Sequence, residues 1–311
     1  MNYPKFEVTI LGCGSATPGA GRHPSAQALT HFQDVFLIDC GEGTQDRLKS
    51  FGVKWNRINQ IFVSHLHGDH IFGLPGLLST FHLNHRERKL QIFSPIGLKE
   101  PLELLLKTGG EPLSFELEWI EMNHSGKKMI WENDRLEVTA VPLDHRIPTY
   151  GFIFKEKEHP RKILVDELFK YPQLNHQQLR KLKLGLDLIL ENDFQVKSNL
   201  VTQKILEQRS YAYWSDTRFH PEFSTFLTGI TTLYHEATFL HNLKEKAEIT
   251  YHSTALEAAQ LAKMCKVERL LIGHYSSRYA SVEDHALEAQ TIFPNTIAVE
   301  EGQTIPILKK K

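Results

Sequence analysis

The 311-residue chain has only three cysteines, and their positions exclude both a disulfide framework and a cysteine-rich metal site. Cys13, Cys40 and Cys265 are far apart in the sequence and odd in number. They therefore do not form a disulfide framework, and they do not provide a cysteine-rich zinc site.

Long apolar runs and an excess of one charge are also missing. No apolar stretch approaches the ~18 residues that span a bilayer, and the first residues lack the apolar region of a signal peptide. We therefore expect a cytoplasmic protein with no membrane partner. The net charge is −1, so any site for a polyanion must be a local patch. The hydrophobic content of 41% is ordinary for a soluble globular protein.

Histidine, in contrast, is abundant, with 17 copies in the chain. Residues 64–78 contain a dense cluster of ligand-type side chains: His65, His67, Asp69 and His70. The cluster follows the apolar run 61–63, which predicts a buried strand. Three imidazoles and a carboxylate are costly to bury unpaired, and they are ligands that zinc prefers. A polar loop between a strand and a helix is the alternative, but the density of ligand types favours a metal site.

Apolar β-branched runs alternate with helical patterns along the chain, which predicts an α/β fold. We expect strands at 6–11, 35–39, 58–63, 90–93, 115–120, 136–142, 151–154, 162–166, 210–214 and 270–272. We expect helices at 44–51, 71–81, 98–107 and 254–265. The last helix has the clearest signal, because Thr254 and Glu257 form a capping box before an amphipathic face.

Four more polar residues lie where a strand is expected to end or a helix to begin. They are His145, Asp216, His252 and His274. Loops at such positions often carry functional groups in α/β folds. Each residue alone is more typical of an ordinary polar loop. Together with the histidine cluster, however, they supply the ligands that a dinuclear metal site needs beyond one segment.

The motifs taken together resemble those of ribonuclease Z, the transfer-RNA 3′-processing endonuclease of the metallo-β-lactamase fold. The histidine cluster alone would indicate only that fold. The narrower resemblance is carried by the segments 71–78, 143–146, 215–218, 235–239, 251–254 and 274–279, in the order of the family. It implies one domain, residues 1–311, built as a four-layer αβ/βα sandwich, with an inserted arm at 167–209. It also implies a homodimer that acts on precursor transfer RNA.

The resemblance assigns metal ligands to matching positions. One metal would be held by His65, His67 and His145, and the other by Asp69, His70 and His274. Asp216 would bridge the two. The expected cofactors are two zinc ions, with manganese or another divalent metal as the alternative. In the family such ions hold a hydroxide between them, which attacks the phosphodiester on the 3′ side of the acceptor stem.

The resemblance also indicates catalytic groups. Asp69 could accept the proton of the attacking water, and His252 is a candidate general acid for the departing 3′-oxygen. A helix N-terminus disfavours a cationic imidazole, so His252 needs a nearby carboxylate, for which we propose Glu236. Asp39 could orient a ligating imidazole; the alternative is a capping role before Gly41.

Three segments depart from the family pattern or need an alternative. The Gly12–Ser15 loop lacks the third glycine of a dinucleotide-binding loop, which favours a tight turn near the metals. Residues 17–24 lack the Lys and Asn usual in the loop that senses the transfer-RNA 3′ end. The arm keeps Leu182–Gly185 but lacks the preceding Gly-Pro, and acidic residues such as Glu191 follow it.

Four cations are candidates for contacts with the substrate. Arg180, Lys181 and Lys183 in the arm could form a basic patch for phosphates, or an ordinary solvated helix face. Arg278 belongs to the last family motif. Two other functions stay open: a metal-dependent hydrolase of a small ester, thioester, lactone or cyclic nucleotide, and a non-catalytic RNA-binding module. The second is disfavoured because every ligand position is filled.

Overall fold

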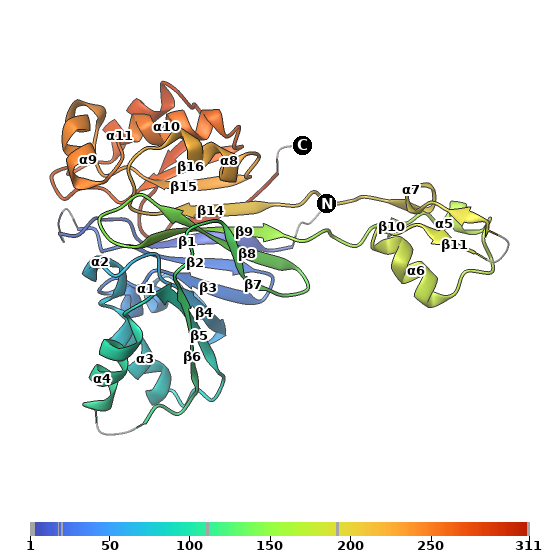
Figure 1. Cartoon of the computed structure of the whole chain (residues 1–311), viewed down its shortest axis with the longest axis horizontal. Helices are drawn as coiled ribbons and strands as arrows, with labels where there is room; N and C mark the ends of the chain where they lie inside the picture. The colour runs from blue at the N-terminus through green and yellow to red at the C-terminus, as the bar shows by residue number, and fades with distance from the viewer. Residues whose placement is uncertain (1–3, 18, 20, 110–111, 191–192, 310–311) are drawn as a thin grey trace.

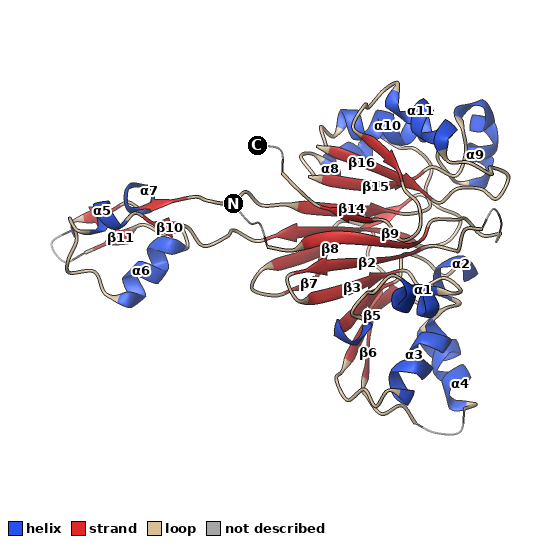
Figure 2. Cartoon of the chain, turned by 180° about the vertical axis from the view of Figure 1, so that it is seen from behind, coloured by secondary structure: helices blue, strands red, loops and turns tan. Residues whose placement is uncertain are grey.

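Two seven-stranded sheets pack face to face, and helices cover the outer face of each (Figure 1, Figure 2). The computed structural model describes residues 4–17, 19, 21–109, 112–190 and 193–309. Pro18 and Ala20 of the predicted 3′-end loop, and Glu191 of the arm, lie outside the described residues. In the described part of the chain, no helix is long and apolar enough to cross a membrane.

The first sheet has the strand order β18-β1-β2-β3-β4-β5-β6. Its strands are β1 (Phe6–Gly12), β2 (Ala26–His31), β3 (Asp34–Ile38), β4 (Ile58–Phe62), β5 (Leu90–Pro95), β6 (Leu117–Met122) and β18 (Thr304–Pro306). β3, β4, β5 and β6 run parallel, so their carboxyl ends meet at one edge. Loops leaving that edge can therefore converge on a shared site.

The second sheet has the order β17-β16-β15-β14-β9-β8-β7. Its strands are β7 (Lys128–Glu132), β8 (Leu136–Leu143), β9 (Thr149–Glu156), β14 (Ser210–Trp214), β15 (Thr232–Glu236), β16 (Arg269–Gly273) and β17 (Thr296–Ala298). β14 to β17 are parallel. Their carboxyl ends lie at the same end of the molecule as those of the first sheet.

Three apolar clusters hold the layers together. The aromatic-rich cluster between the sheets contains Phe36, Phe62 and Phe154. Helices α1 (Thr44–Ser50), α3 (Leu74–Leu83) and α4 (Lys99–Lys107) cover the first sheet. Helices α8 (Ser224–Leu227), α10 (Ala255–Met264) and α11 (Glu283–Gln290) cover the second, with α9 (Lys244–Thr250) beside them. The predicted four-layer αβ/βα sandwich is confirmed.

An arm projects from the sandwich between β9 and β14 (Figure 1). It contains β10 (Lys162–Ile163), α5 (Val165–Leu168), α6 (His176–Lys183), β11 (Leu188–Ile189), β12 (Gln195–Val196), α7 (Ser198–Val201) and β13 (Thr202–Gln203). The arm predicted at 167–209 overlaps these elements, which span 162–203, whereas Arg209 at its predicted end is buried against Glu156 of β9. Four buried residues give it a small apolar core of its own: Leu182, Leu188, Val196 and Val201.

Two of the predicted elements are wrong in part. Residues 71–81 form not one helix but the end of α2 (Gly68–Ile71) and most of α3. The break lies at Gly73, where a Cβ atom would come within 2.2 Å of the carbonyl oxygen of Gly41. The strand predicted at 162–166 covers only β10, because Val165 begins the short helix α5.

Candidate metal centre and active site

All seven predicted metal ligands come together at the edge where the parallel strands end. His65 and His67 follow β4, and Asp69 and His70 lie in α2. The others follow the ends of β8, β14 and β16: His145, Asp216 and His274. The site therefore joins loops from both sheets.

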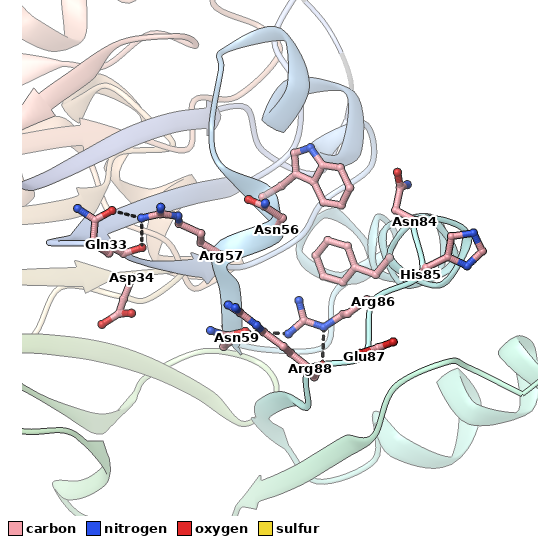
Figure 3. A pocket seen from close by; sticks show the side chains of 12 residues that line it. Gln33, Asp34, Asn56, Arg57, Asn59, Asn84, His85, Arg86, Glu87 and Arg88 are labelled. Atoms are coloured by element: carbon pink, nitrogen blue, oxygen red, sulfur yellow. Dashed lines mark hydrogen bonds between the residues drawn. The ribbon is translucent and has the colours of Figure 1, made fainter.

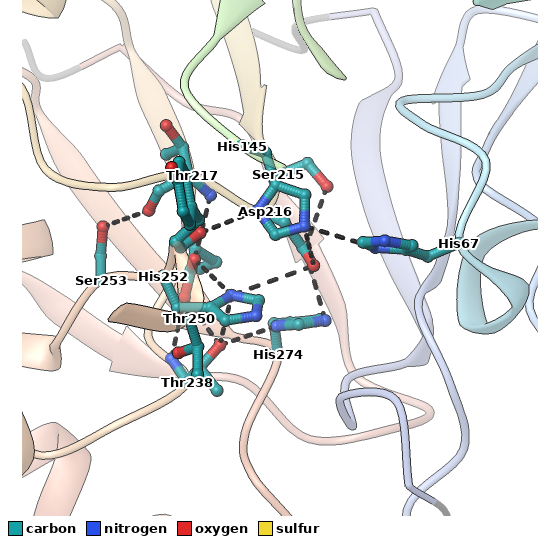
Figure 4. A network of polar contacts seen from close by, with 12 residues as sticks. His67, His145, Ser215, Asp216, Thr217, Thr238, Thr250, His252, Ser253 and His274 are labelled. Carbon is teal, nitrogen blue, oxygen red and sulfur yellow. Dashed lines mark hydrogen bonds and ion pairs between the residues drawn. The ribbon is translucent and has the colours of Figure 1, made fainter. Parts of the chain in front are cut away.

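Asp216 lies between two groups of histidines, and each of its oxygens faces one group (Figure 4). Its Oδ2 is 3.6 Å from His65 Nε2 and 4.0 Å from His145 Nε2. Its Oδ1 is 3.5 Å from His70 Nε2 and 3.3 Å from His274 Nε2. This is the arrangement that a carboxylate needs to bridge two ions.

The ligand atoms within each group converge on a common point. His67 Nδ1 is 3.0 Å from His65 Nε2 and 3.3 Å from His145 Nε2. On the other side, Asp69 Oδ2 is 3.5 Å from the Nε2 atoms of His70 and His274. In each group the ligand atoms lie within 4.8 Å of one another. A divalent ion fits such a donor set of imidazole nitrogens and carboxylate oxygens.

The outer nitrogens of two of the cluster histidines are held by buried polar groups. His70 Nδ1 donates to Asp39 Oδ2 at 2.7 Å, and His65 Nδ1 donates to Ser64 Oγ at 3.0 Å. Ser64 Oγ and the hydroxyl of Tyr213 both donate to Asp39, at 2.8 and 2.7 Å. Asp39 therefore orients the imidazole of His70, which is the role that the sequence suggested for it as the alternative to capping before Gly41.

The second sheet orients its histidines in the same way. His145 Nδ1 donates to the carbonyl oxygen of Tyr251 at 2.8 Å. His274 Nδ1 donates to Thr238 Oγ1 at 2.8 Å, and that hydroxyl donates to Glu236 Oε2 at 2.7 Å. A proton on Nδ1 leaves the Nε2 lone pair of each ring free to bind a metal.

Two buried nitrogens show that the site fits a cation. His70 Nε2 and His274 Nε2 have no hydrogen-bond partner among the described residues, although both side chains are buried. Both nitrogens face carboxylate oxygens of Asp69 and Asp216. A buried polar atom without a partner is costly, and a shared divalent cation would satisfy all of these groups.

The backbone at this edge is held in an unusual conformation. Asp39 and His274 have φ values of 56° and 62°, in the left-handed region that residues other than glycine rarely adopt. Such strain persists only where surrounding contacts enforce it, and it clusters at functional sites. Here it turns both side chains toward the metal ligands as the chain leaves β3 and β16.

His252 and Glu236 form a close pair beside Asp216. His252 Nδ1 donates to Glu236 Oε1 at 2.9 Å, and it lies 3.9 Å from Asp216 Oδ2. Burial lowers the pKa of His252, but the carboxylate of Glu236 outweighs burial and raises the pKa to about 8. The carboxylate that the sequence required for a cationic His252 is therefore in contact with it.

The two carboxylates among the ligands stay ionised. Burial alone would raise their pKa values, but the neighbouring histidines outweigh it. His70 and His274 hold the pKa of Asp69 well below its usual range, and the same histidines lower the pKa of Asp216. Both side chains are thus in the charged form that a metal requires.

A cleft of about 550 Å³ opens onto the ligands. Ser15 of the Gly12–Ser15 loop and Pro24 of segment 17–24 both line it. Ser15 N donates to the carbonyl oxygen of Tyr275 at 3.0 Å. Phe72 and Arg146 line it as well. Arg146 is exposed and makes no ion pair with a carboxylate in the described part of the chain. A cation in this position can face an anionic substrate.

Comparison with known proteins identifies the family. Residues 6–295 match the family model described as "Anti-Pycsar protein Apyc1". A ribonuclease Z of Bacteroides fragilis is 40% identical over 305 residues, which cover 97% of this chain and 99% of the relative. A ribonuclease Z of Cytophaga hutchinsonii is 42% identical over 301 residues, with 96% and 95% coverage. The chain belongs to the ribonuclease Z family and to the family of the Apyc1 model.

Solved structures agree with this assignment. Human tRNase Z, short form, superposes with a TM-score of 0.70 at 25% identity, covering 97% of this chain and 100% of the human one. The metallo-β-lactamase fold protein YhfI of Bacillus subtilis reaches a TM-score of 0.69 at 16% identity, with 98% and 100% coverage. The second likeness bears on the fold alone.

The predicted substrate-binding cations of this ribonuclease Z relative lie in two places. Arg278 is at the rim of the cleft, where its Nε donates to Ser276 Oγ at 3.0 Å and its guanidinium lies 5.3 Å from the Phe239 ring. The other three, Arg180, Lys181 and Lys183, are exposed on α6 in the arm. The arm projects from the end of the sandwich opposite α2 (Figure 1).

Sequence reasoning missed several residues of the site. Ser64 and Thr238 relay hydrogen bonds between carboxylates and ligand histidines. Tyr213 reaches Asp39 from the other sheet, and Arg146 lines the cleft. Ser64 and Arg146 each adjoin a ligand in the sequence, which is a signal that could have found them. Thr238 lies in the family-like segment 235–239, which is another such signal, whereas no signal of this kind points to Tyr213.

Proposed function

We propose that this member of the ribonuclease Z family is an endoribonuclease that cuts precursor transfer RNA on the 3′ side of the acceptor stem. One observation carries the proposal: Asp216 joins two metal-type donor groups directly beside the His252–Glu236 pair. Hydrolysis of a phosphodiester needs charge neutralisation and a proton donor for the leaving oxygen, and this arrangement holds groups for both.

Each residue has a distinct role in this proposal. Two divalent ions held by the seven ligands would offset phosphate charge and make a bound water more acidic. Asp69 accepts a proton from the attacking water. His252 donates a proton from Nε2 to the departing 3′-oxygen, because its Nδ1 already donates to Glu236. Glu236 stabilises the cationic form of His252 and fixes its tautomer.

The arm and the rim of the cleft supply contacts to RNA in this proposal. The three α6 cations contact phosphates at a distance from the cut, and Arg278 binds the substrate near the metals. Zinc as the metal, a homodimer and a cytoplasmic location complete the proposal. Membership of the ribonuclease Z family supports these three parts of the proposal.

The experiment compares two substrates with one preparation. Purified, zinc-loaded protein is incubated with radiolabelled precursor transfer RNA and, in parallel, with bis(p-nitrophenyl) phosphate. We expect cleavage at the acceptor-stem boundary and slow turnover of the small diester. Asp216→Ala should abolish both activities; retained activity would contradict the dinuclear mechanism. Replacing the three α6 cations with Gln should reduce RNA cleavage far more than diester turnover.

A hydrolase of a small phosphodiester, thioester or lactone is the second candidate function. The family model that matches residues 6–295 does not carry the name of a ribonuclease, so it leaves this candidate open. The metal ligands would serve either reaction. Turnover of the diester with intact RNA would move the function to this candidate.

A further inference from the structure

A second pocket, of about 610 Å³, lies at the other end of the first sheet from the metals (Figure 3). It is lined by the β2–β3 turn, by the 3₁₀ turn Trp55–Arg57 before β4, and by the segment between α3 and β5. These segments precede β3, β4 and β5, and His65 and His67 of the candidate metal centre follow the carboxyl end of β4. Neither the metal ligands nor the proposed proton donor takes part in this pocket.

Three arginines line the pocket: Arg57, Arg86 and Arg88. In the part of the chain that the structure describes, none of them forms an ion pair with a carboxylate. Asp34 and Glu87 also line the pocket, yet neither approaches a guanidinium within ion-pair distance among the described residues. The pocket thus offers unpaired positive charge.

Arg86 is the best positioned of the three, because neutral groups hold its partly buried side chain. Its Nε donates to the carbonyl oxygen of Arg88 at 2.7 Å, and its Nη2 donates to Asn59 Oδ1 at 2.9 Å and to the carbonyl oxygen of Lys89 at 3.0 Å. Burial and the charge of Arg88 lower the pKa of Arg86 to about 10. A bound anion would offset both the burial of the Arg86 charge and its repulsion by Arg88.

Two aromatic rings, Trp55 and Phe81, line the pocket beside these cations. The Trp55 ring stacks on Phe81 with centroids 5.7 Å apart and planes 9° from parallel, and the Arg86 guanidinium lies 5.1 Å from the Phe81 ring. Arg57 Nη1 donates hydrogen bonds to two oxygens of Gln33, the side-chain Oε1 and the backbone carbonyl oxygen. Guanidinium groups fixed in this way have lost part of their freedom before binding, which favours recognition of the oxygens of a phosphate.

The pocket lies at the end of the molecule from which the arm departs. Asp34 pairs with His31 across the β2–β3 hairpin. His31 Nε2 donates to Glu156 Oε1 at 3.1 Å, and Glu156 is the last residue of β9 before the arm. The exposed Arg135 contacts both regions: its guanidinium lies 4.6 Å from the ring of Phe32 in the β2–β3 turn, and its carbonyl oxygen accepts from Lys157 N at 2.8 Å.

We propose that this arginine pocket binds a phosphate group, and that its source is the backbone of the RNA that the arm contacts. The RNA part rests on the proposed function, whereas the phosphate part does not. Phosphate is an anion that guanidinium groups bind through paired, charge-assisted hydrogen bonds. Continuity with the arm favours a polymer over a free mononucleotide.

The test measures binding rather than cleavage, with mature transfer RNA as the probe for the RNA source and inorganic phosphate and AMP as probes for a free ligand. Two exposed or partly exposed arginines are replaced in R57Q/R88Q, which leaves the contacts of Arg86 in place. Each lost phosphate contact lowers the slope of log Kd against log salt by about one. We therefore expect the variant to bind RNA at least ~10-fold more weakly at low salt, with a slope lower by about two.

The matched control removes the same charge from the outer helices. Lys99→Gln with Lys263→Gln changes two exposed lysines on α4 and α10, and RNA binding should stay within about twofold of the wild type. R86K tests geometry, since it keeps the charge but loses the planar fork; weakened binding supports the proposal.

Each outcome decides one part of the proposal. Weaker RNA binding by R57Q/R88Q, but not by the control, supports the RNA source. Unchanged RNA binding with lost binding of phosphate or AMP supports the phosphate site and overturns the RNA source. Unchanged binding of all three probes overturns the pocket. A wild type that binds RNA through this pocket but cuts no precursor would contradict the proposed function alone.

Discussion

His285 gives the stability of this protein a defined dependence on pH. The side chain is fully buried in α11, and its ring packs against Tyr275 and Tyr279 with centroids 4.9 and 4.6 Å away. Neither ring nitrogen has a hydrogen-bond partner among the described residues. Burial, with a smaller effect of the Arg22 charge, lowers the pKa of His285 to about 4.

The sign of the effect follows from where the proton binds. In the unfolded chain histidine titrates near pH ~6.5, so between pH ~4 and ~6.5 the unfolded state binds more protons than the folded one. The contribution of His285 is therefore complete above pH ~6.5 and is lost as the pH falls toward 4. Linkage gives a loss of about 2 kcal/mol between pH 7 and pH 5 from this residue alone.

The perturbation is His285→Phe, which keeps a ring between the two tyrosines and removes the titration. Urea unfolding at pH 7 and pH 5 gives the free energy of unfolding of each protein. We expect the loss of stability on acidification to be about 2 kcal/mol smaller in the variant. Other titrating groups, the metal ligands included, cancel in this difference. His176→Gln, an exposed change in α6, is the control and should behave like the wild type.

The variant also has an outcome that would refute the reasoning. If His285→Phe and the wild type lose the same stability between pH 7 and pH 5, the imidazole does not titrate with a depressed pKa. A cost of overpacking by the larger ring would lower the stability at both pH values equally. It would therefore leave the difference between them unchanged.

Two further predictions concern the metal site. Arg146→Gln should lower kcat/KM about 10- to 100-fold for the substrate that is cut, since a hydrogen bond to a charged group contributes about 1.5–3 kcal/mol; Arg146→Lys should recover part of the loss, and wild-type kinetics would exclude the contact. Asp39→Asn should weaken metal binding about 10- to 100-fold, measured by competition with a chelator, and an unchanged affinity would limit Asp39 to a structural role.

The candidate metal centre could be predicted from the sequence because its residues are dense. His65, His67, Asp69 and His70 occupy six positions, and their residue types have few other uses in so short a segment. The remaining candidate ligands could be predicted because each follows a strand whose apolar run is clear. Asp216 and His274 are examples, at the ends of β14 and β16.

What the sequence did not reveal depends on contacts between segments far apart in the chain. Thr238 matters only because the fold places its hydroxyl between His274 and Glu236. Strand β2 was missed because Ala26–His31 has few β-branched residues; it is buried since it lies in the middle of its sheet. The break before α3 depends on the close approach of Gly73 to Gly41, which no local pattern encodes.

The position of the arm leads to the last prediction. Tyr150, near the start of β9, donates its N–H to Ser64 beside the metal ligands, whereas Glu156 at the other end leads into the arm. Six residues of strand span about 20 Å, and the arm extends farther from the metals (Figure 1). The α6 cations of one chain therefore lie far from its own active site.

If the chain forms the expected homodimer, one arm would hold RNA that the partner's metals cut. Mixing Asp216→Ala protein with protein lacking the α6 cations should then restore RNA cleavage to about a quarter of the wild-type level. Half of the dimers become mixed, and each mixed dimer keeps one intact pairing of arm and metals. The subunits must be exchanged or co-expressed, and mass spectrometry verifies the mixed species. Mixed dimers without activity would show that arm and metals act within one chain, because neither subunit then has both.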